Sequence, residues 1–322
     1  ENAVKVEAVA LTDGKDIHIP AVIEYIERTG IHSGDSACVL PAVNIPEKHL
    51  KMIGAYTRKI AAEFGAAGLI GVKYAISGDT VCVLDSTFRA HRWAAYNAPF
   101  VSKVCGIPVV RLAVRLILGA KLGDLGLSAR KIPHCGVKEA VFPFNMFPEV
   151  DPVLGPEMHS TGAALGLADA YELAFYKVEE AAGQLLPQSG TVLFSISASE
   201  KSESVELARE FSTLGFQLKA TEGTQRFFKD AGIACEKILK LNFGRPDIVD
   251  AIKNGEIQLV INTPIGKRGA VDDSYIRKTA IRERVPYITT LAAARAAAKG
   301  IAASRKQESP AVSLQRYHAG IK

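Results

Sequence analysis

The chain has 322 residues, of which 48% are hydrophobic and 23% are charged. These values exclude a disordered chain, and at about 150 residues per domain the length is enough for two compact units. The formal net charge of +5 comes from basic residues dispersed among acidic ones, which favours small anionic ligands and does not indicate a nucleic-acid partner.

No apolar stretch approaches the roughly 18 residues of a membrane span, and no basic-then-apolar leader opens the sequence. Because Glu1 is not Met and a strand-like pattern begins at once, we expect further chain to precede it. The cysteines are widely spaced, odd in number and without a CxxC pair, so we expect free thiols in a reducing compartment, the cytoplasm. They are Cys38, Cys82, Cys105, Cys135 and Cys235.

Three strands are predicted in the first half of the chain. Residues 2–10 alternate between apolar and polar side chains, as a half-buried strand does. Residues 70–77 and 80–85 form two further strands joined by Gly78 and Asp79. A glycine in such a two-residue loop can adopt the positive φ of a tight hairpin turn.

Helices and a domain boundary follow from the spacing of apolar residues and from helix-breaking residues. Residues 46–64 have apolar side chains at helical spacing, and residues 109–118 are predicted as the next helix. Prolines make the stretch 123–187 less regular until a helix near 169–182. The glycines, proline and serine that follow this helix place a domain boundary near Pro187.

The second half alternates strands with helices. Residues 191–197, 216–220, 259–263 and 287–290 are predicted as strands, and a helical stripe covers residues 207–214. This alternation predicts a parallel, doubly wound α/β sheet.

Polar residues end each of these four strands. In such sheets, ligands bind beyond the carboxyl ends of the strands, where helix N-termini offer N–H groups to anions. The alternative is that these side chains only cap helices, which we weigh about equally for any one of them. No nucleophile with a partnered base is evident, so binding fits better than catalysis. The group comprises Ser195, Ser197, Thr221, Glu222, Gly223, Thr224, Asn262, Thr263, Thr289 and Thr290, with Lys201, Lys240, Arg245, Lys267 and Arg268 in nearby loops.

The strings ATEGT (220–224), GRPDIVDAIKNGEIQLVINTPIGKR (244–268) and YITTLAAARAA (287–297) resemble the effector domain of the carbamoyl-phosphate synthase family, whose fold is shared with methylglyoxal synthase. Methylglyoxal synthase itself is disfavoured, because its acidic GGD-type motif has no match beside residues 244–246. Pro264 departs from the hydroxyl residue often found there. The resemblance implies a nucleotide monophosphate site formed by Lys201, Thr221, Thr224, Lys240 and Asn262.

The segment GIHSGDSACVLPAVNI (30–45) resembles the second ATP-grasp half of the same family's large subunit, and residues 99–108 and 137–162 extend the likeness to nearly the whole chain. Taken alone, His32 and Asp35 are more typical of a polar turn than of a ligand set. The resemblance implies a partial ATP-grasp domain (1–122), a connecting region (123–187) and an allosteric effector domain (188–322).

In this family a Gln and an E-x-N-P-R-A-x-R segment hold the Mg²⁺ that ATP-dependent phosphoryl transfer needs. This chain has Lys73 in place of the Gln, and residues 85–92 read DSTFRAHR. A protonated lysine cannot coordinate Mg²⁺ and would compete for Asp85, the candidate metal ligand that stands in place of the family's Glu. We therefore expect little or no metal binding. Arg89 and Arg92 are kept as candidate catalytic residues; they could hold an anion or simply pair with Asp85.

The resemblance also implies an ornithine site at Glu27, Asp35, Glu139 and Thr289, where carboxylates would suit a cationic amino acid. Each acid alone is more typical of a solvated surface charge.

The family function implied is an ATP-dependent ligase that makes carbamoyl phosphate from bicarbonate, glutamine-derived ammonia and ATP, for pyrimidine and arginine synthesis. The adenine-binding and glycine-rich parts of an ATP-grasp fold are missing, so we expect the chain to be inactive alone. It would act with an upstream part of the large subunit and a glutaminase small subunit, under control by UMP or IMP and by ornithine. The altered metal ligands favour the alternative, a non-catalytic nucleotide-sensing module.

Overall fold

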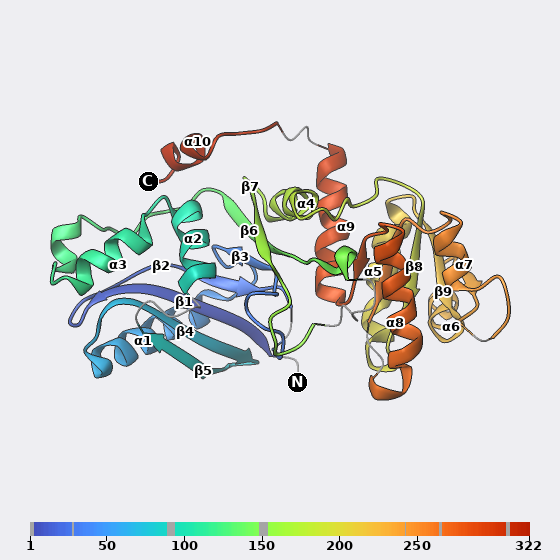
Figure 1. The fold of residues 1–322 in the computed structure, drawn as a ribbon, viewed down its shortest axis with the longest axis horizontal. Coiled ribbons are helices and arrows are strands. Elements are labelled where there is room, and N and C mark those ends of the chain that lie inside the picture. Colours follow the sequence, from blue (N-terminus) through green and yellow to red (C-terminus); the bar gives the residue numbers. More distant parts are fainter. Residues whose placement is uncertain are drawn as a thin grey trace. The chain divides into compact units, whose positions relative to one another are not determined.

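The computed structural model describes residues 3–27, 29–88, 94–147, 154–241, 243–263, 266–306 and 310–322, with the backbone alone for residues 94–96, 145 and 266–272. The chain forms two compact units (Figure 1). Unit 1 comprises residues 1–140, 155–178 and 310–322, and unit 2 comprises residues 141–154 and 179–309. Across the described ranges, none of the helices combines the length and apolar character needed to cross a lipid bilayer.

Unit 1 is built on a seven-stranded sheet in the order β5-β4-β1-β2-β3-β6-β7. The pairs of strands from β5 to β6 are antiparallel. Its strands are β1 (Val4–Asp13), β2 (Ile17–Tyr25), β3 (Cys38–Leu40), β4 (Ala67–Ser77), β5 (Thr80–Phe88), β6 (Cys135–Val141) and β7 (Gly162–Ala168). Its helices are α1 (Glu47–Phe64), α2 (Ala94–Cys105), α3 (Val109–Ile117), α4 (Tyr171–Ala181) and α10 (Leu314–Ala319), with a short 3-10 helix at Leu122–Leu125.

The predicted hairpin and helices of this unit are confirmed. Strands β4 and β5 pair on either side of Gly78, whose φ of 56° is the left-handed value that the turn requires. Helix α1 ends at Gly65, also left-handed, so its last carbonyls are capped by a residue without a steric cost.

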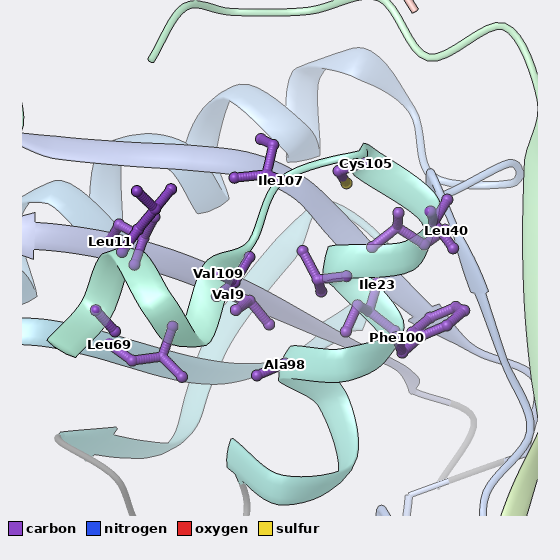
Figure 2. Packing of buried hydrophobic residues seen from close by; sticks show 14 of the residues in the cluster. Val9, Leu11, Ile23, Leu40, Leu69, Ala98, Phe100, Cys105, Ile107 and Val109 are labelled. Carbon is purple, nitrogen blue, oxygen red and sulfur yellow. The ribbon is translucent and has the colours of Figure 1, made fainter. Parts of the chain in front are cut away.

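Alternation along β1 sends its side chains into two cores. Val9 and Leu11 belong to one hydrophobic cluster with residues of helices α2 and α3, and Figure 2 shows Val9 next to Val109 of α3. The intervening residues of β1 face a second cluster that includes Ile53 of α1. Strand β1 is thus buried on both faces, and any charged residue on it must find partners.

Unit 2 contains a five-stranded sheet in the order β10-β9-β8-β11-β12, and all of its strand pairs are parallel, as predicted. Its strands are β8 (Thr191–Ser195), β9 (Gln217–Thr221), β10 (Glu236–Ile238), β11 (Leu259–Asn262) and β12 (Tyr287–Ile288). The helices are α5 (Lys201–Thr213), α6 (Glu222–Asp230), α7 (Ile248–Lys253), α8 (Gly266–Arg282) and α9 (Leu291–Lys306), with 3-10 turns at Phe144–Met146 and Ala198–Glu200.

The stretch 123–187, which the sequence pattern leaves irregular, contributes β6 and β7 to the sheet of unit 1. Strand β6 pairs with β3, with Val137 opposite Val39. Strand β6 therefore extends the sheet of unit 1 beyond β3.

Candidate functional site

In unit 2 the strand register brings the polar strand ends to one level. Ser195 of β8 lies opposite Asn262 of β11, and Ile238 of β10 lies opposite Thr221 of β9. Since β8 and β9 pair in parallel up to Phe194, Thr221 is next to the end of β8. The carboxyl edge of this sheet therefore carries a row of hydroxyl and amide groups, at the point where helices begin.

The two threonines of this row are linked to each other and to β8. Thr221 precedes α6, and its hydroxyl donates to Thr224 Oγ1 at 3.4 Å. Thr224 Oγ1 also accepts from the backbone N–H of Ile196 at 3.3 Å. Both side chains are buried, so they fix the start of α6 against the end of β8.

Lys201, the first residue of α5, reaches the first turn of α6. A β-carbon added to Gly223 would lie 2.8 Å from Lys201 Nζ, so the ammonium would have to move from this position if residue 223 had a side chain. Helix N-termini carry a partial positive charge and favour anions. An ammonium group beside a helix N-terminus gathers two positive charges at one point, which favours a phosphate bound next to both.

A buried hydroxyl at the same edge also lacks a partner. Ser195 Oγ is buried and finds no hydrogen-bond acceptor or donor within the described part of the chain. Unsatisfied buried polar atoms are uncommon in folded proteins, and a bound ligand is one way to satisfy them. Ser195, one of the polar residues predicted at the strand ends, is thus a candidate contact for a bound ligand.

The side chain of Asn262 forms hydrogen bonds with two buried charged residues of α8. Its Nδ2 donates to Asp273 Oδ1 at 3.1 Å and to the carbonyl of Ser195 at 3.4 Å. Its Oδ1 accepts from Arg277 Nη1 at 3.2 Å. Asp273 and Arg277 belong to α8 and are buried, and sequence reasoning did not single them out. Asn262 therefore serves to position the end of β11 against α8.

The remaining predicted residues of unit 2 differ in their roles. Lys240 lies two residues beyond β10 and is half-buried, within the same edge of the sheet. Thr289 follows β12, whereas the next residue, Thr290, accepts from the N–H of Ala293 and caps α9. The capping interpretation is thus confirmed for Thr290. Arg245 pairs with Asp250 at 2.7 Å. Pro264 and the side chains of Lys267 and Arg268 lie outside the described residues.

In unit 1, Lys73 and Asp85, the two residues at positions where the resemblance implies metal ligands, form an ion pair. Lys73 and Asp85 are opposite each other on β4 and β5, and Lys73 Nζ lies 3.5 Å from Asp85 Oδ2. The side chain of Lys73 is 23% exposed and that of Asp85 is 54% exposed. The candidate catalytic residues Arg89 and Arg92 lie outside the described residues.

The residues present do not fit a bound Mg²⁺. Within the described ranges, no three His, Cys, Asp or Glu side chains lie close enough together to hold a metal ion. Magnesium is bound by oxygen ligands at about 2 Å, whereas the ammonium of Lys73 cannot coordinate it and lies 3.5 Å from Asp85 Oδ2. At that separation a divalent ion and the ammonium would repel by several kcal/mol at an effective dielectric constant of about 20.

A buried acid lies on the same face and was missed by sequence reasoning. Glu7 is opposite Lys73 in the pairing of β1 with β4. Its Oε2 accepts from Tyr25 Oη at 2.5 Å and from Asn97 Nδ2 at 3.1 Å. Burial raises the pKa of Glu7 to about 7. The signal in the sequence was the charge at an inward-facing position of a strand otherwise rich in valine and alanine.

The acids of the predicted ornithine site do not all have the same surroundings. Asp35 is buried and accepts from the backbone N–H groups of His159 and Ser160, at 2.8 and 3.0 Å. Burial raises the pKa of both Glu27 and Glu139, and for Glu27 the charge of Glu139 adds to the effect. These acids lie in unit 1, whereas Thr289 lies in unit 2.

Comparison with known proteins covers both units. Residues 2–125 match the family model described as carbamoyl-phosphate synthase L chain, ATP binding domain, and residues 203–289 match the MGS-like domain. The carbamoyl phosphate synthase large chain of Archaeoglobus fulgidus is 47% identical over 320 residues, which are 99% of this chain and 29% of that protein. The corresponding C-terminal section of Aquifex aeolicus is 40% identical over 323 residues, 95% of this chain and 59% of that protein.

The chain thus spans about 30% of the length of the large chains that it matches. Among solved structures, the biotin carboxylase domain of a single-chain bacterial carboxylase aligns with a TM-score of 0.44 and 15% identity, over 58% of this chain and 47% of that one.

Proposed function

Because the chain is homologous over nearly its whole length to the C-terminal section of carbamoyl phosphate synthase large chains, we propose that its unit 2 is a regulatory module that binds a nucleoside monophosphate. The observation that carries this proposal is the position of the Lys201 ammonium over the glycine in the first turn of α6. A phosphate bound at this helix start would contact both the ammonium of Lys201 and the helix N–H groups.

The other residues of the edge have supporting roles. Thr221 and Thr224 would hold the first turn of α6 and offer hydroxyl groups, and Lys240 would add a second cation. Ser195 would donate its free hydroxyl to a ligand oxygen. None of these groups is a nucleophile activated by a neighbouring base, so the chemistry supported is binding.

For the whole protein, we propose a cytoplasmic ligase that forms carbamoyl phosphate from bicarbonate, ammonia and ATP for pyrimidine and arginine synthesis. ATP and Mg²⁺ would be its cofactors, and Lys73 argues against Mg²⁺ binding by this chain. This chain would supply the end of an ATP-grasp domain (1–122), a connecting region (123–187) and the effector domain (188–322). The upstream large subunit and a glutaminase subunit would supply the rest. The likeness of residues 2–125 to the ATP binding domain supports this role.

We also propose that ornithine binds to the acids of unit 1, namely Glu27, Asp35 and Glu139. The raised pKa values of Glu27 and Glu139 support a cationic ligand there, because a bound ammonium group would relieve the cost of two neighbouring buried carboxylates.

The second candidate is a nucleotide-sensing module without catalysis, and the ion pair of Lys73 with Asp85 favours it. Mg²⁺-dependent ATP turnover in an assembly with the upstream subunit would decide between the two. Normal turnover would contradict the degenerate module, and its absence would contradict the ligase.

Calorimetry with UMP and IMP tests the regulatory site in the chain itself. We expect saturable binding of at least one of them, and a loss of about tenfold or more in Lys201→Met. The exposed Lys51 of α1 gives the matched control, Lys51→Met, which should bind as the parent does. No heat with either nucleotide, or equal binding by Lys201→Met, would contradict the proposal.

A further inference from the structure

A second group of cations is gathered in unit 1. Lys5 lies two residues before Glu7 on β1, and Lys73 lies opposite Glu7 on β4. Lys138 of β6 is opposite Cys38 of β3, which in turn is opposite Tyr25 of β2. Residues directly opposite each other share a face, and these side chains share the face of the core in Figure 2. The lysines and Glu7 form the polar end of this face.

Two of the three lysines are fixed by the loop that follows β2. Lys5 Nζ donates to the carbonyl of Ile31 at 3.1 Å and lies 4.5 Å from the centre of the Tyr25 ring. Lys138 Nζ donates to the carbonyl of Ser33 at 3.1 Å. Both lysines are buried, and none of these partners is an anion, so their charges are not neutralised by these contacts.

Lys73 is the most accessible of the three. Its ion pair with Asp85 is long, at 3.5 Å, and more than half of the Asp85 side chain is exposed to water. Exposed pairs of this kind contribute little, about 0–1 kcal/mol, so a better anion could displace Asp85. The ammonium of Lys73 is therefore available to a ligand.

The fields of the three lysines overlap. The pKa of Lys5 is lowered to about 8, chiefly by burial and then by the charge of Lys73, with a smaller effect of Lys138. The pKa of His32 is lowered by burial and by all three lysines, although Asp35 acts against them. The acids that oppose these lysines are Glu7, Glu27 and Glu139, and burial raises the pKa of all three, which weakens their negative charge. The Oε1 atom of Glu7 is buried and unpartnered among the residues that the structure describes.

We propose that unit 1 binds a phosphate group at this face without a divalent cation, with the ammonium of Lys73 as its direct partner and those of Lys5 and Lys138 as fixed charges behind it. Lysine binds phosphate as a point charge, and partly buried ammonium groups attract an anion more strongly than groups in water. The ammonium of Lys73 takes the place of the metal in neutralising the anion. The phosphate is either inorganic phosphate or the end of a nucleotide polyphosphate tail.

Site-resolved lysine acetylation of the whole chain tests this proposal, with the extent of modification read by mass spectrometry. In EDTA, at constant ionic strength, inorganic phosphate or ATP should protect Lys73 in a saturable way, and exposed Lys51 should not be protected. Replacing EDTA by Mg²⁺ should leave the half-protection concentration of phosphate within about twofold. A lower concentration for ATP than for phosphate would assign the site to a nucleotide tail, and equal concentrations would assign it to free phosphate.

Two variants make the test independent of folding defects. Lys73→Met should weaken phosphate or ATP binding in calorimetry by about tenfold, measured in a Lys201→Met background so that unit 2 does not contribute. Asp85→Asn removes only an exposed competitor and should lower the concentration needed to protect Lys73. No protection of Lys73 by either ligand, protection only with Mg²⁺, or no effect of Asp85→Asn would overturn the proposal. Protection of Lys201 in the same spectra reports separately on the nucleotide site of unit 2.

Discussion

The ammonium nitrogen of Lys201 lies 2.8 Å from the point that a β-carbon on Gly223 would occupy, so these two residues cannot both keep their places if Gly223 gains a side chain. The contact joins the start of α5 to the first turn of α6. It makes Gly223 a determinant of the proposed anion site, although a glycine offers no side chain to a ligand.

Gly223→Ala should therefore weaken nucleoside monophosphate binding without destabilising unit 2. The added methyl group displaces the ammonium from the helix N-terminus, and we expect a loss of about tenfold in affinity by calorimetry. Alanine is a better helix former than glycine, so the thermal midpoint should be unchanged or higher.

The control for this substitution is Gly54→Ala in α1, where a new β-carbon would meet nothing within 4 Å. It should stabilise the chain by about 0.5–1 kcal/mol and leave nucleotide binding unchanged. Equal affinity in Gly223→Ala and the parent chain would show that the ammonium of Lys201 does not contact the ligand.

Asn262→Leu distinguishes a positioning role from a purely ligand-binding one. Leucine has a similar size but leaves Arg277 Nη1 and Asp273 Oδ1 without their bonds to Asn262. We expect the free energy of unfolding in urea, without ligand, to fall by about 2–3 kcal/mol. Asn254→Ala, at the exposed end of α7, should change it by less than about 0.5 kcal/mol. Unchanged stability of Asn262→Leu with weakened nucleotide binding would mean that Asn262 acts only on the ligand.

Local patterns predicted those parts of the fold that depend on near neighbours in the chain. The β4–β5 hairpin follows from two apolar runs around Gly78, and the parallel sheet of unit 2 follows from alternating strands and helices. The pairing of β6 with β3 was not predicted, because Val137 and Val39 are almost a hundred residues apart and the prolines of that stretch hide its strands.

The candidate sites show the same division. The polar residues at the strand ends were enough to predict the location of an anion site, because parallel strands end at one edge of the sheet. The hydrogen bond between Asn97 and Glu7 joins residues 90 positions apart. The hydrogen bond from Arg277 to Asn262 depends on how α8 packs against β11. Neither contact leaves a periodic signal in the sequence, so only the folded structure shows which charges are partnered.

The raised pKa of Glu7 predicts a pH dependence of stability. An acid whose pKa is raised on folding keeps its proton in the folded state while the unfolded chain has lost it, so stability falls as pH rises from the ordinary range of glutamate to about 7. Glu7→Gln keeps the size and the acceptor for Tyr25 but does not titrate. The variant should lose less stability than the parent between pH 4.5 and 8, by about 2–3 kcal/mol.

Urea unfolding at several pH values measures this difference. Glu63→Gln, at the exposed end of α1, is the matched control and should follow the parent chain. Parallel pH profiles for Glu7→Gln and the parent would mean that Glu7 is ionised in the folded protein throughout this range.

Ornithine binding should also depend on pH, through the two raised acids of unit 1. Burial raises the pKa of Glu27 and Glu139 well above the usual range of glutamate, so both are largely neutral in mild acid. A neutral carboxyl attracts an ammonium group weakly, whereas the amino groups of ornithine stay charged up to about pH 9. Affinity should therefore rise by about tenfold between pH 5.5 and 8.5.

Glu139→Gln separates this effect from a general change in the protein. The variant keeps the hydrogen-bonding shape but removes one titrating group and the repulsion that it exerts on Glu27. Its ornithine affinity should be lower at pH 8.5 and should change less with pH than that of the parent chain. Calorimetry at the two pH values measures both quantities. Ornithine binding that weakens as pH rises, or a pH profile unchanged in Glu139→Gln, would exclude these carboxylates as the partners of the ligand's ammonium groups.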